Sequence, residues 1–462
     1  MKAAASSAPL PSNEPPRQGG RRSGGRAPAG ADDGPTQLRI DLLYPEGPAA
    51  KAGLVVGDWI VGVGSRKFKE GSLAPLAKAL VRAESSKGVV TLLVQRGGKG
   101  KAEKVDVTIP VGGAAAKKPL AGPGRAALWK QSLTWLAQRQ QEDGGFVETL
   151  SGKNGAVIQA AMAGLAWLGG GSDLKNGAHK DNVRRAADFV IANVSQLGAM
   201  GGGRPGGANW NQANWGYAHA AMFLGELHAR TPDEGVRASL HFCAKRLVET
   251  QETSGGWAHG PGGKNALNYL ELNIVTGLAL CGLGAAQQSG FEVPESTIEK
   301  AEAYLIASGG GDGGIGYSTS PGQKGSGNIG RTAAAWIGYL ALGKRKSAWA
   351  KKMAGYVKRN ADEVMGGHAS LMQHILLAGV AAQAHGKGTA KTYWKTMERD
   401  LVLARAPDGS FQPRPWHESL SMGSNSDVTF GEVWTTAAWT MVLVATPSKE
   451  GAVGYPALTA TR

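Results

Sequence analysis

The spacing of hydrophobic positions changes near residue 125. Between residues 38 and 109 the apolar residues form short runs typical of β-strands, with one amphipathic helix expected over 73–84. From residue 125 onward they recur with helical spacing, interrupted by glycine and proline. The predicted strands are 38–43, 59–63, 89–94 and 105–109, and the predicted helices are 126–140, 155–168, 180–195, 213–229, 234–250, 268–287, 295–307, 329–342, 347–360, 368–385, 389–404 and 431–445.

A short motif recurs six times in the helical part, and we call it the glycine corner. It combines a polar residue with paired glycines and, in most copies, a large apolar residue. Successive copies lie 43 to 58 residues apart, enough for two helices and two connections. The six copies are 141–146, 200–203, 251–257, 311–315, 365–368 and 407–411.

The twelve helices therefore pair into six hairpins, and the second helix of each hairpin is the more apolar one. A helix that is apolar all round is buried all round. An inner ring of buried helices inside an outer ring of amphipathic ones satisfies this pattern. An open solenoid would also stack helix pairs, but six near-equal pairs joined by one fixed corner favour closure into an (α/α)6 toroid.

Composition divides the chain into five segments. Residues 1–35 are rich in Pro, Gly, Ser, Ala and Arg and predict a disordered tail. A small β/α domain is expected over 36–112, a linker over 113–124, the toroid over 125–446 and a C-terminal tail over 447–462. No apolar run reaches the length of a membrane span, and the N-terminus shows no signal segment.

The net charge of +15 is spread along the chain, so a polyanion partner, whether nucleic acid or acidic glycan, is permitted but not indicated, and no specific nucleic acid is predicted. Cys243 and Cys281 both lie in apolar helical patterns, away from any metal-type spacing, and we expect buried free thiols.

Residues 47–58, from Gly47-Pro48-Ala49 through Ala52-Gly53-Leu54 to Gly57-Asp58, closely resemble the hallmark of bacterial PDZ domains, and the resemblance covers about residues 36–112. It implies peptide binding by strand addition, and hence a protein or peptide partner. The loop expected to capture a ligand's carboxylate is replaced here by a stretch containing Asp32 and Asp33. A module that docks within its own chain is therefore an equal alternative.

The glycine corners resemble the repeats of terpenoid cyclases and of protein prenyltransferase β subunits. More narrowly, 214–219, 223–227, 251–260, 328–330 and 366–368 resemble a bacterial family of unknown function that joins a PDZ domain to such a toroid. That family is usually exported, so the resemblance implies an exported or periplasmic protein. It implies a fold without a mechanism.

Known toroid chemistries leave no signature in the sequence. An Asp-x-Asp-Asp run is missing, and the only Asp-Asp pair, Asp32-Asp33, lies in the tail. A Gly-x-Ser-x-Gly elbow, a His-Glu-x-x-His motif and a zinc-ligand pattern are missing as well. We predict no cofactor and no metal, and no catalytic residue is assigned.

Polar and aromatic residues near the ends of the inner helices remain as candidates to line a cavity. His219 and Glu226 share a helix face with Trp215, as an acid–base pair or as a structural contact. Asn328 is expected to cap a helix, and Asp143, Asp312 and Asp408 are expected to stabilise turns. The candidates are Trp210, Trp215, His219, Glu226, His259, Asn268, Glu271, Tyr317, Asn328, Arg331, His368, Trp416 and Glu432.

The favoured interpretation is a binding or scaffold protein, with a PDZ-like module and a toroid that holds a small-molecule or glycan ligand. The alternatives are a terpenoid-cyclase-like enzyme, which predicts a dry aromatic cavity, and a glycan lyase or hydrolase, which predicts an open cleft near His219, Tyr317 and Arg331. Whether the chain is an enzyme stays open at this point.

Overall fold

The computed structural model describes residues 35–41, 43, 46–111, 123–147, 152–197, 212–260, 271–364, 370–413 and 426–445. Its helical part contains twelve helices in these ranges, at or close to the predicted positions. The outer helices are α3 (Pro123–Arg139), α5 (Lys180–Asn193), α7 (Glu234–Glu249), α9 (Glu295–Ser308), α11 (Ala348–Arg359) and α13 (Lys387–Ala404). The inner helices are α4 (Gly152–Gly169), α6 (Ala213–Arg230), α8 (Asn273–Gln288), α10 (Ile329–Ala341), α12 (Leu371–His385) and α14 (Ser426–Ala445).

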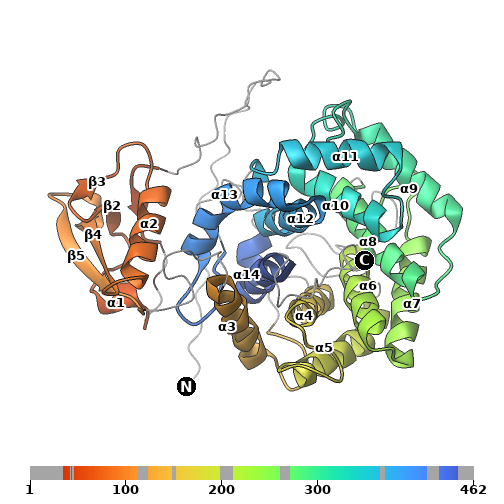
Figure 1. Cartoon of the computed structure of the whole chain (residues 1–462), viewed down its shortest axis with the longest axis horizontal. Helices are drawn as coiled ribbons and strands as arrows, with labels where there is room; N and C mark the ends of the chain where they lie inside the picture. Colours follow the sequence, from red (N-terminus) through yellow and green to blue (C-terminus); the bar gives the residue numbers. More distant parts are fainter. Residues whose placement is uncertain are drawn as a thin grey trace.

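The inner helices form a closed ring. Each packs against the next in chain order, from α4 through α6, α8, α10 and α12 to α14, and α14 packs back against α4 (Figure 1). An open solenoid would leave α14 and α4 apart. The toroid predicted from the sequence is therefore confirmed.

The ring is tight because small residues let inner helices approach one another. A Cβ atom added to Gly277 would lie 2.6 Å from the backbone of Ala334, and one added to Gly284 would lie 2.6 Å from the backbone of Ala341. Both pairs join α8 to α10. Side chains larger than hydrogen would force these helices apart.

Each of four glycine corners packs its first glycine on the outer helix of another hairpin. Gly144, Gly255, Gly313 and Gly409 all have φ between 89° and 97°, a region that favours glycine. Added Cβ atoms would lie 2.0 Å from the Arg185 carbonyl oxygen, 2.2 Å from that of Lys300 and 2.4 Å from that of Lys352. Positive φ and close approach together explain why this motif recurs.

The acids of the corners act as predicted, as turn residues. A carboxylate oxygen of Asp143 accepts from Gly145 N (2.9 Å), and one of Asp312 accepts from Gly314 N (3.0 Å). Asp408 accepts from both the backbone and the hydroxyl of Ser410. These contacts satisfy backbone groups of the turn.

The last corner closes the ring on the first helix. The Ser132 hydroxyl of α3 donates to Gly409 O (2.8 Å), Trp135 Nε1 donates to Asp408 (2.9 Å), and Gln131 Nε2 donates to Pro407 O (3.0 Å). Residues at opposite ends of the toroid sequence are thus joined by three hydrogen bonds.

Threonines of the inner helices hold the corners in place. The backbone N–H groups of Trp257, Ile315 and Phe411 donate to the hydroxyls of Thr276, Thr332 and Thr436, respectively, at 2.9 to 3.1 Å. Helix α8 begins at Asn273, five residues after its predicted start. The reason is that Leu272 is extended and its N–H donates to Trp257 O (2.9 Å).

The N-terminal domain is a small antiparallel sheet with two helices. Its strands are β1 (Leu38–Arg39), β2 (Trp59–Val63), β3 (Arg66–Lys67), β4 (Val89–Gln95) and β5 (Glu103–Thr108), in the order β1-β2-β4-β5 with β3 beside β2. Helix α1 spans Pro48–Lys51 and α2 spans Leu73–Glu84. Strand β1 is shorter than the predicted 38–43.

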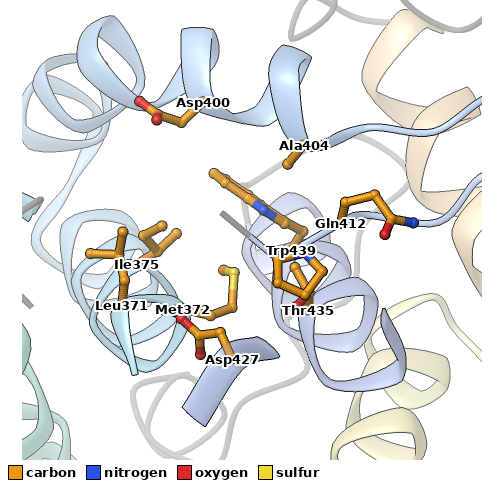
Figure 2. Close-up of a pocket in the computed structure, with 10 residues that line it drawn as sticks. Leu371, Met372, Ile375, Asp400, Ala404, Gln412, Asp427, Thr435 and Trp439 are labelled. Carbon is orange, nitrogen blue, oxygen red and sulfur yellow. Dashed lines mark hydrogen bonds between the residues drawn. The ribbon is translucent and has the colours of Figure 1, made fainter. Parts of the chain in front are cut away.

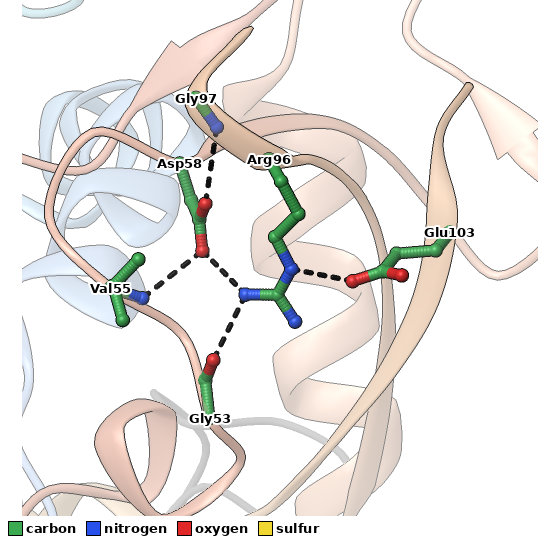
Figure 3. A network of polar contacts seen from close by, with 6 residues as sticks. All are labelled: Gly53, Val55, Asp58, Arg96, Gly97 and Glu103. Carbon is green, nitrogen blue, oxygen red and sulfur yellow. Dashed lines mark hydrogen bonds and ion pairs between the residues drawn. The ribbon is translucent and has the colours of Figure 1, made fainter. Parts of the chain in front are cut away.

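The hallmark of the N-terminal domain is built around a buried aspartate (Figure 3). Asp58 accepts from Val55 N (3.1 Å), from Arg96 Nη1 (2.6 Å) and from Gly97 N (3.4 Å). Burial alone would raise the pKa of Asp58, but these hydrogen bonds lower it below its usual value. The Gly-Asp pair is therefore structural, because it ties the loop after α1 to the end of β4.

The main described contact between the two domains joins one helix of each. Helix α2 packs against α13 and lies between the sheet and the toroid (Figure 1). Arg405, directly after α13, forms an ion pair with Glu84 at the end of α2, and both side chains are largely buried. Helix α2 therefore docks the N-terminal domain on the toroid.

We expect charge reversal at this ion pair to loosen the docking. Arg405→Glu places two acids together, because Glu84 stays in place, and amide hydrogen exchange in α2 should speed up. The double variant Arg405→Glu/Glu84→Arg restores opposite charges and should recover slow exchange. Equal exchange in wild type and the single variant would show that the pair does not hold the domains together.

Candidate functional site

The inner helices of the toroid bury nearly all their side chains, with two informative exceptions. Between Ala213 and Leu227 of α6 every residue is buried except Trp215. Within α10 every residue is buried except Arg331. Both lie in the first turn of their helices, on either side of α8 in the ring. They are therefore the accessible side chains at this end of α6 and α10.

Two residues that follow glycine corners lie beside these side chains. His259, after corner 251–257, lies next to Trp215, and Tyr317, after corner 311–315, lies next to Arg331. The carbonyl of His259 accepts from Asn214 N, and that of Tyr317 accepts from Asn273 N, both at 3.1 Å. His259 and Tyr317 thus occupy matching positions, at the N-terminal ends of α6 and α8. We call the set Trp215, His219, His259, Tyr317, Arg331 and Trp434 the rim.

A row of ring contacts runs inward from the half-buried Trp215 of α6 to the buried Trp434 of α14. Trp215 Nε1 donates to His259 Nδ1 (2.9 Å), and their ring centroids are 5.9 Å apart. Trp215 also stacks on His219 (6.4 Å), and His219 meets the edge of Trp434 (6.1 Å). Since α4 stands between α6 and α14 in the ring, the row crosses from one helix to a non-neighbour.

His219 presents a neutral imidazole within this row. Its Nδ1 lies 2.9 Å from Trp215 O, which can only accept, so Nδ1 carries the proton. Its Nε2 is buried and has no hydrogen-bond partner among the described residues. Burial lowers the pKa of His219 to about 4. Nε2 is thus a hydrogen-bond acceptor at neutral pH.

Asp427 fixes the far end of the row. It accepts from Trp434 Nε1 (3.1 Å), from the Ser370 hydroxyl (2.6 Å) and from Met372 N (2.8 Å). One carboxylate therefore orients the indole and supplies a partner for the first turn of α12.

Arg331 and Tyr317 form a second group on the rim. The guanidinium lies over the Tyr317 ring, 5.6 Å from its centroid. Its Nε donates to Ile315 O (3.5 Å) and its Nη2 to Ser326 O (3.1 Å). Burial lowers the pKa of Arg331 to about 10, so it stays charged at neutral pH.

The other predicted residues fall into three groups. Asn328 is the N-cap of α10, as predicted, because its side chain accepts from Gly330 N and Arg331 N. Glu271 is half-buried before α8, and Glu432 is half-buried after the kink at Gly431 in α14. Trp210, Asn268, His368 and Trp416 lie outside the described residues.

Glu226 forms an ion pair within α6 instead of reaching His219. Arg230 Nη2 and Nε donate to Glu226 Oε1 at 2.7 and 2.9 Å, and Arg230 also donates to Leu168 O. The carboxylate is 1% exposed and sits two turns from His219. These contacts favour the structural interpretation of Glu226 over an acid–base pair.

A small pocket lies between α12, α13 and α14 (Figure 2). None of the predicted candidates lines this pocket. Its polar residues lie in a loop and on helix faces that carry no motif, so the sequence did not indicate them. Trp439 stands at its centre in the view. Its lining comprises Leu371, Met372, Ile375, Asp400, Ala404, Gln412, Pro413, Asp427, Thr435 and Trp439.

Cys243 and Cys281 are buried free thiols, as predicted, and burial raises the pKa of both. Within the described ranges, no three His, Cys, Asp or Glu side chains gather as a metal site would require. No helix in the part that the structure describes is long and apolar enough to cross a membrane.

Family models match both parts of the chain. A model described as a domain of unknown function (DUF6288) matches residues 129–447, and a PDZ domain model matches residues 39–96. The first match spans well over half of the chain. The chain belongs to the DUF6288 family. The second match shows that the N-terminal domain is a PDZ domain, as the residues around Asp58 predict.

Solved structures of similar shape include glycoside hydrolases. An unsaturated glucuronyl hydrolase from Bacillus sp. GL1 is 13% identical, with a TM-score of 0.46 over 70% of this chain and 94% of that one. A family 76 glycoside hydrolase from a bovine Bacteroides thetaiotaomicron strain is 10% identical, with a TM-score of 0.46 over 77% and 83% of the two chains. A protein from Actinoplanes is 17% identical, with a TM-score of 0.43 over 70% and 100%. A search of curated proteins returns no match.

The sequence-based resemblance is therefore confirmed at the level of a PDZ domain joined to an α/α toroid. The likeness to terpenoid cyclases and prenyltransferases is not shown by these comparisons. The roles of the rim residues stay predictions, which the experiments below test.

Proposed function

We propose that this DUF6288 protein is a glycan-binding protein whose site is the rim of the toroid. The observation that carries the proposal is the half-buried Trp215 indole, which stacks with the rings of His259 and His219. Indole faces pack against the C–H faces of sugar rings, and flanking polar groups bind hydroxyls. The His219 ring is buried and stacks on Trp215, which helps to hold the indole in place.

The placement of Trp215 also supports a binding role. It is the one residue between Ala213 and Leu227 that is not buried, and its indole nitrogen is held by His259. The ring is therefore both accessible and fixed in orientation. A rigid aromatic side chain binds with little loss of conformational entropy.

A prenyl or terpenoid ligand fits these observations less well. Such a ligand requires a dry, enclosed, apolar cavity, whereas the rim combines half-buried aromatic rings with a charged Arg331. The rim chemistry is that of a wet polar ligand.

Truncation of the accessible indole tests the proposal. We expect Trp215→Ala to weaken oligosaccharide binding at least tenfold, since a lost stacking contact of about 1.4 kcal/mol has this effect. Isothermal titration of the full chain, with ligands chosen from a glycan array, gives the affinity. The melting temperature of each variant confirms folding.

A matched control is Trp349→Ala, which removes a half-buried indole from outer helix α11. This variant should bind like wild type. An equal loss in both variants, or a wild-type protein that binds no oligosaccharide, would contradict the proposal.

The PDZ domain supplies a second binding function, for protein or peptide. Strand β1 is the first strand of the sheet order and pairs only with β2 among the described strands. Strand addition at such an edge is the way PDZ domains bind peptides. Hydrogen exchange of β1 with and without C-terminal peptides tests this function, and unchanged exchange would exclude it for those peptides.

A further inference from the structure

We infer that Arg331 is a recognition site for the anionic group of an acidic glycan. The inference rests on the proposed glycan-binding function and adds the ligand class. A carboxylate or a sulfate on the sugar supplies the shared chemistry, a negative charge delocalised over two or more oxygens that accept hydrogen bonds.

The Arg331 side chain is preorganised for binding an anion. Two backbone carbonyls, Ile315 O and Ser326 O, hold its Nε and Nη2, and the Tyr317 ring supports one face of the guanidinium. The side chain has therefore already lost most of its rotational freedom. Binding of an anion then costs little additional entropy.

The positive charge of Arg331 lacks a carboxylate partner among the described residues. The charged or ionisable groups that act on it there are the phenols of Tyr317 and Tyr356, which are neutral at neutral pH. By comparison, Arg96, Arg184, Arg230, Arg237, Arg246, Arg399 and Arg405 all form ion pairs with acids. A partly desolvated guanidinium without a counter-charge gains strongly from an added anion.

Arg331 is also the accessible residue of its helix. It is half-buried, while the rest of α10 is buried, and its Nη2 end reaches solvent. It lies in the first turn of α10, where the helix dipole adds to the attraction for an anion.

A matched pair of ligands gives the sharpest test. One is a uronate oligosaccharide, and the other is the same oligosaccharide after reduction of its carboxylates to alcohols. We expect wild type to bind the uronate form at least tenfold tighter at 50 mM salt, with the difference shrinking as salt increases. A sulfated neutral oligosaccharide as a third arm shows whether sulfate replaces carboxylate.

Variants of Arg331 test whether this residue causes the preference for the uronate form. Arg331→Gln should remove the preference for the uronate form while leaving affinity for the reduced form unchanged. Arg331→Lys keeps the charge and should retain part of the preference. The control Arg359→Gln changes another arginine that donates to a backbone carbonyl, that of Asp312, and should behave like wild type.

The outcomes separate the two proposals. Equal binding of both ligand forms by wild type, or a preference that survives in Arg331→Gln, overturns the role of Arg331 and leaves glycan binding in place. Binding of neither form overturns the glycan-binding function as well. The wild-type comparison of the two ligands is valid even where a variant fails to fold.

Discussion

Gly255→Ala is expected to destabilise the toroid by about 3–5 kcal/mol. The backbone there has φ of +95°, which costs a non-glycine residue about 1–2 kcal/mol, and the new methyl group would lie 2.2 Å from Lys300 O of α9. The contacted atom belongs to a helix backbone and cannot rotate away. Urea unfolding followed by circular dichroism measures the loss.

Gly290→Ala is the matched control for this substitution. Gly290 has φ of +91°, close to that of Gly255, but no atom lies within 4 Å of an added Cβ. The substitution should therefore lower the free energy of unfolding by only about 1–2 kcal/mol, the cost of a positive φ in alanine. A similar loss in both variants would show that the packing of the corner on α9 contributes nothing.

The same variants test whether the ring unfolds as one unit. Since α14 packs on α4 and the last corner binds α3, damage at the corner of Gly255 should raise hydrogen exchange all around the inner ring. Faster exchange confined to α7, α8 and α9 would contradict a cooperative ring.

The second large effect is a loss of stability in acid that depends on His219. Its pKa is about 4 in the folded chain and about 6.5 in an unfolded one, so the unfolded state binds the extra proton between these values. The stability contribution of neutral His219 is fully present above pH 6.5 and is lost as the pH falls toward 4. By pH 4.5 the loss should reach about 2–3 kcal/mol.

His219→Gln tests this effect, because glutamine keeps polar atoms without titrating. The free energy of unfolding, measured from pH 7 to pH 4.5, should fall less steeply for the variant, by about 1.4 kcal/mol per pH unit at most. His259, whose pKa burial also lowers, stays in both proteins and contributes the same slope to each. Parallel curves for wild type and variant would show that His219 is not held neutral in the fold.

Much of the architecture could be predicted from sequence because its signals are local. Helical spacing, breakers and the recurring glycine corner gave the helices and their alternation, and the residues up to Gly57-Asp58 gave the PDZ domain. The side chains of Asn328 and the corner aspartates accept hydrogen bonds from backbone N–H groups only two or three residues away. Interactions between residues so close in sequence can be predicted from a single chain.

The site was harder to predict because its contacts join distant residues. Trp434 meets His219 across the ring, and Asp427 joins α14 to α12, so neither appears as a spaced motif. The candidate list therefore omitted both. Glu226 was included because it shares a face with His219, although its neighbour Arg230, also on α6, binds it. Helix periodicity gives the face of a residue but cannot choose between partners on it.

The threonines behind the corners show the same limit. Thr276, Thr332 and Thr436 each receive a backbone hydrogen bond from a corner 17 to 25 residues earlier. In the sequence they are single polar residues in apolar helices. Their role becomes visible only when the corner and the helix lie side by side.

The most direct test of the central claim is a crystal structure of the full chain with a uronate oligosaccharide. We predict sugar density over the Trp215 indole, with a carboxylate bound by Arg331. Sugar bound instead in the pocket between α12, α13 and α14, or away from both Trp215 and Arg331, would contradict it.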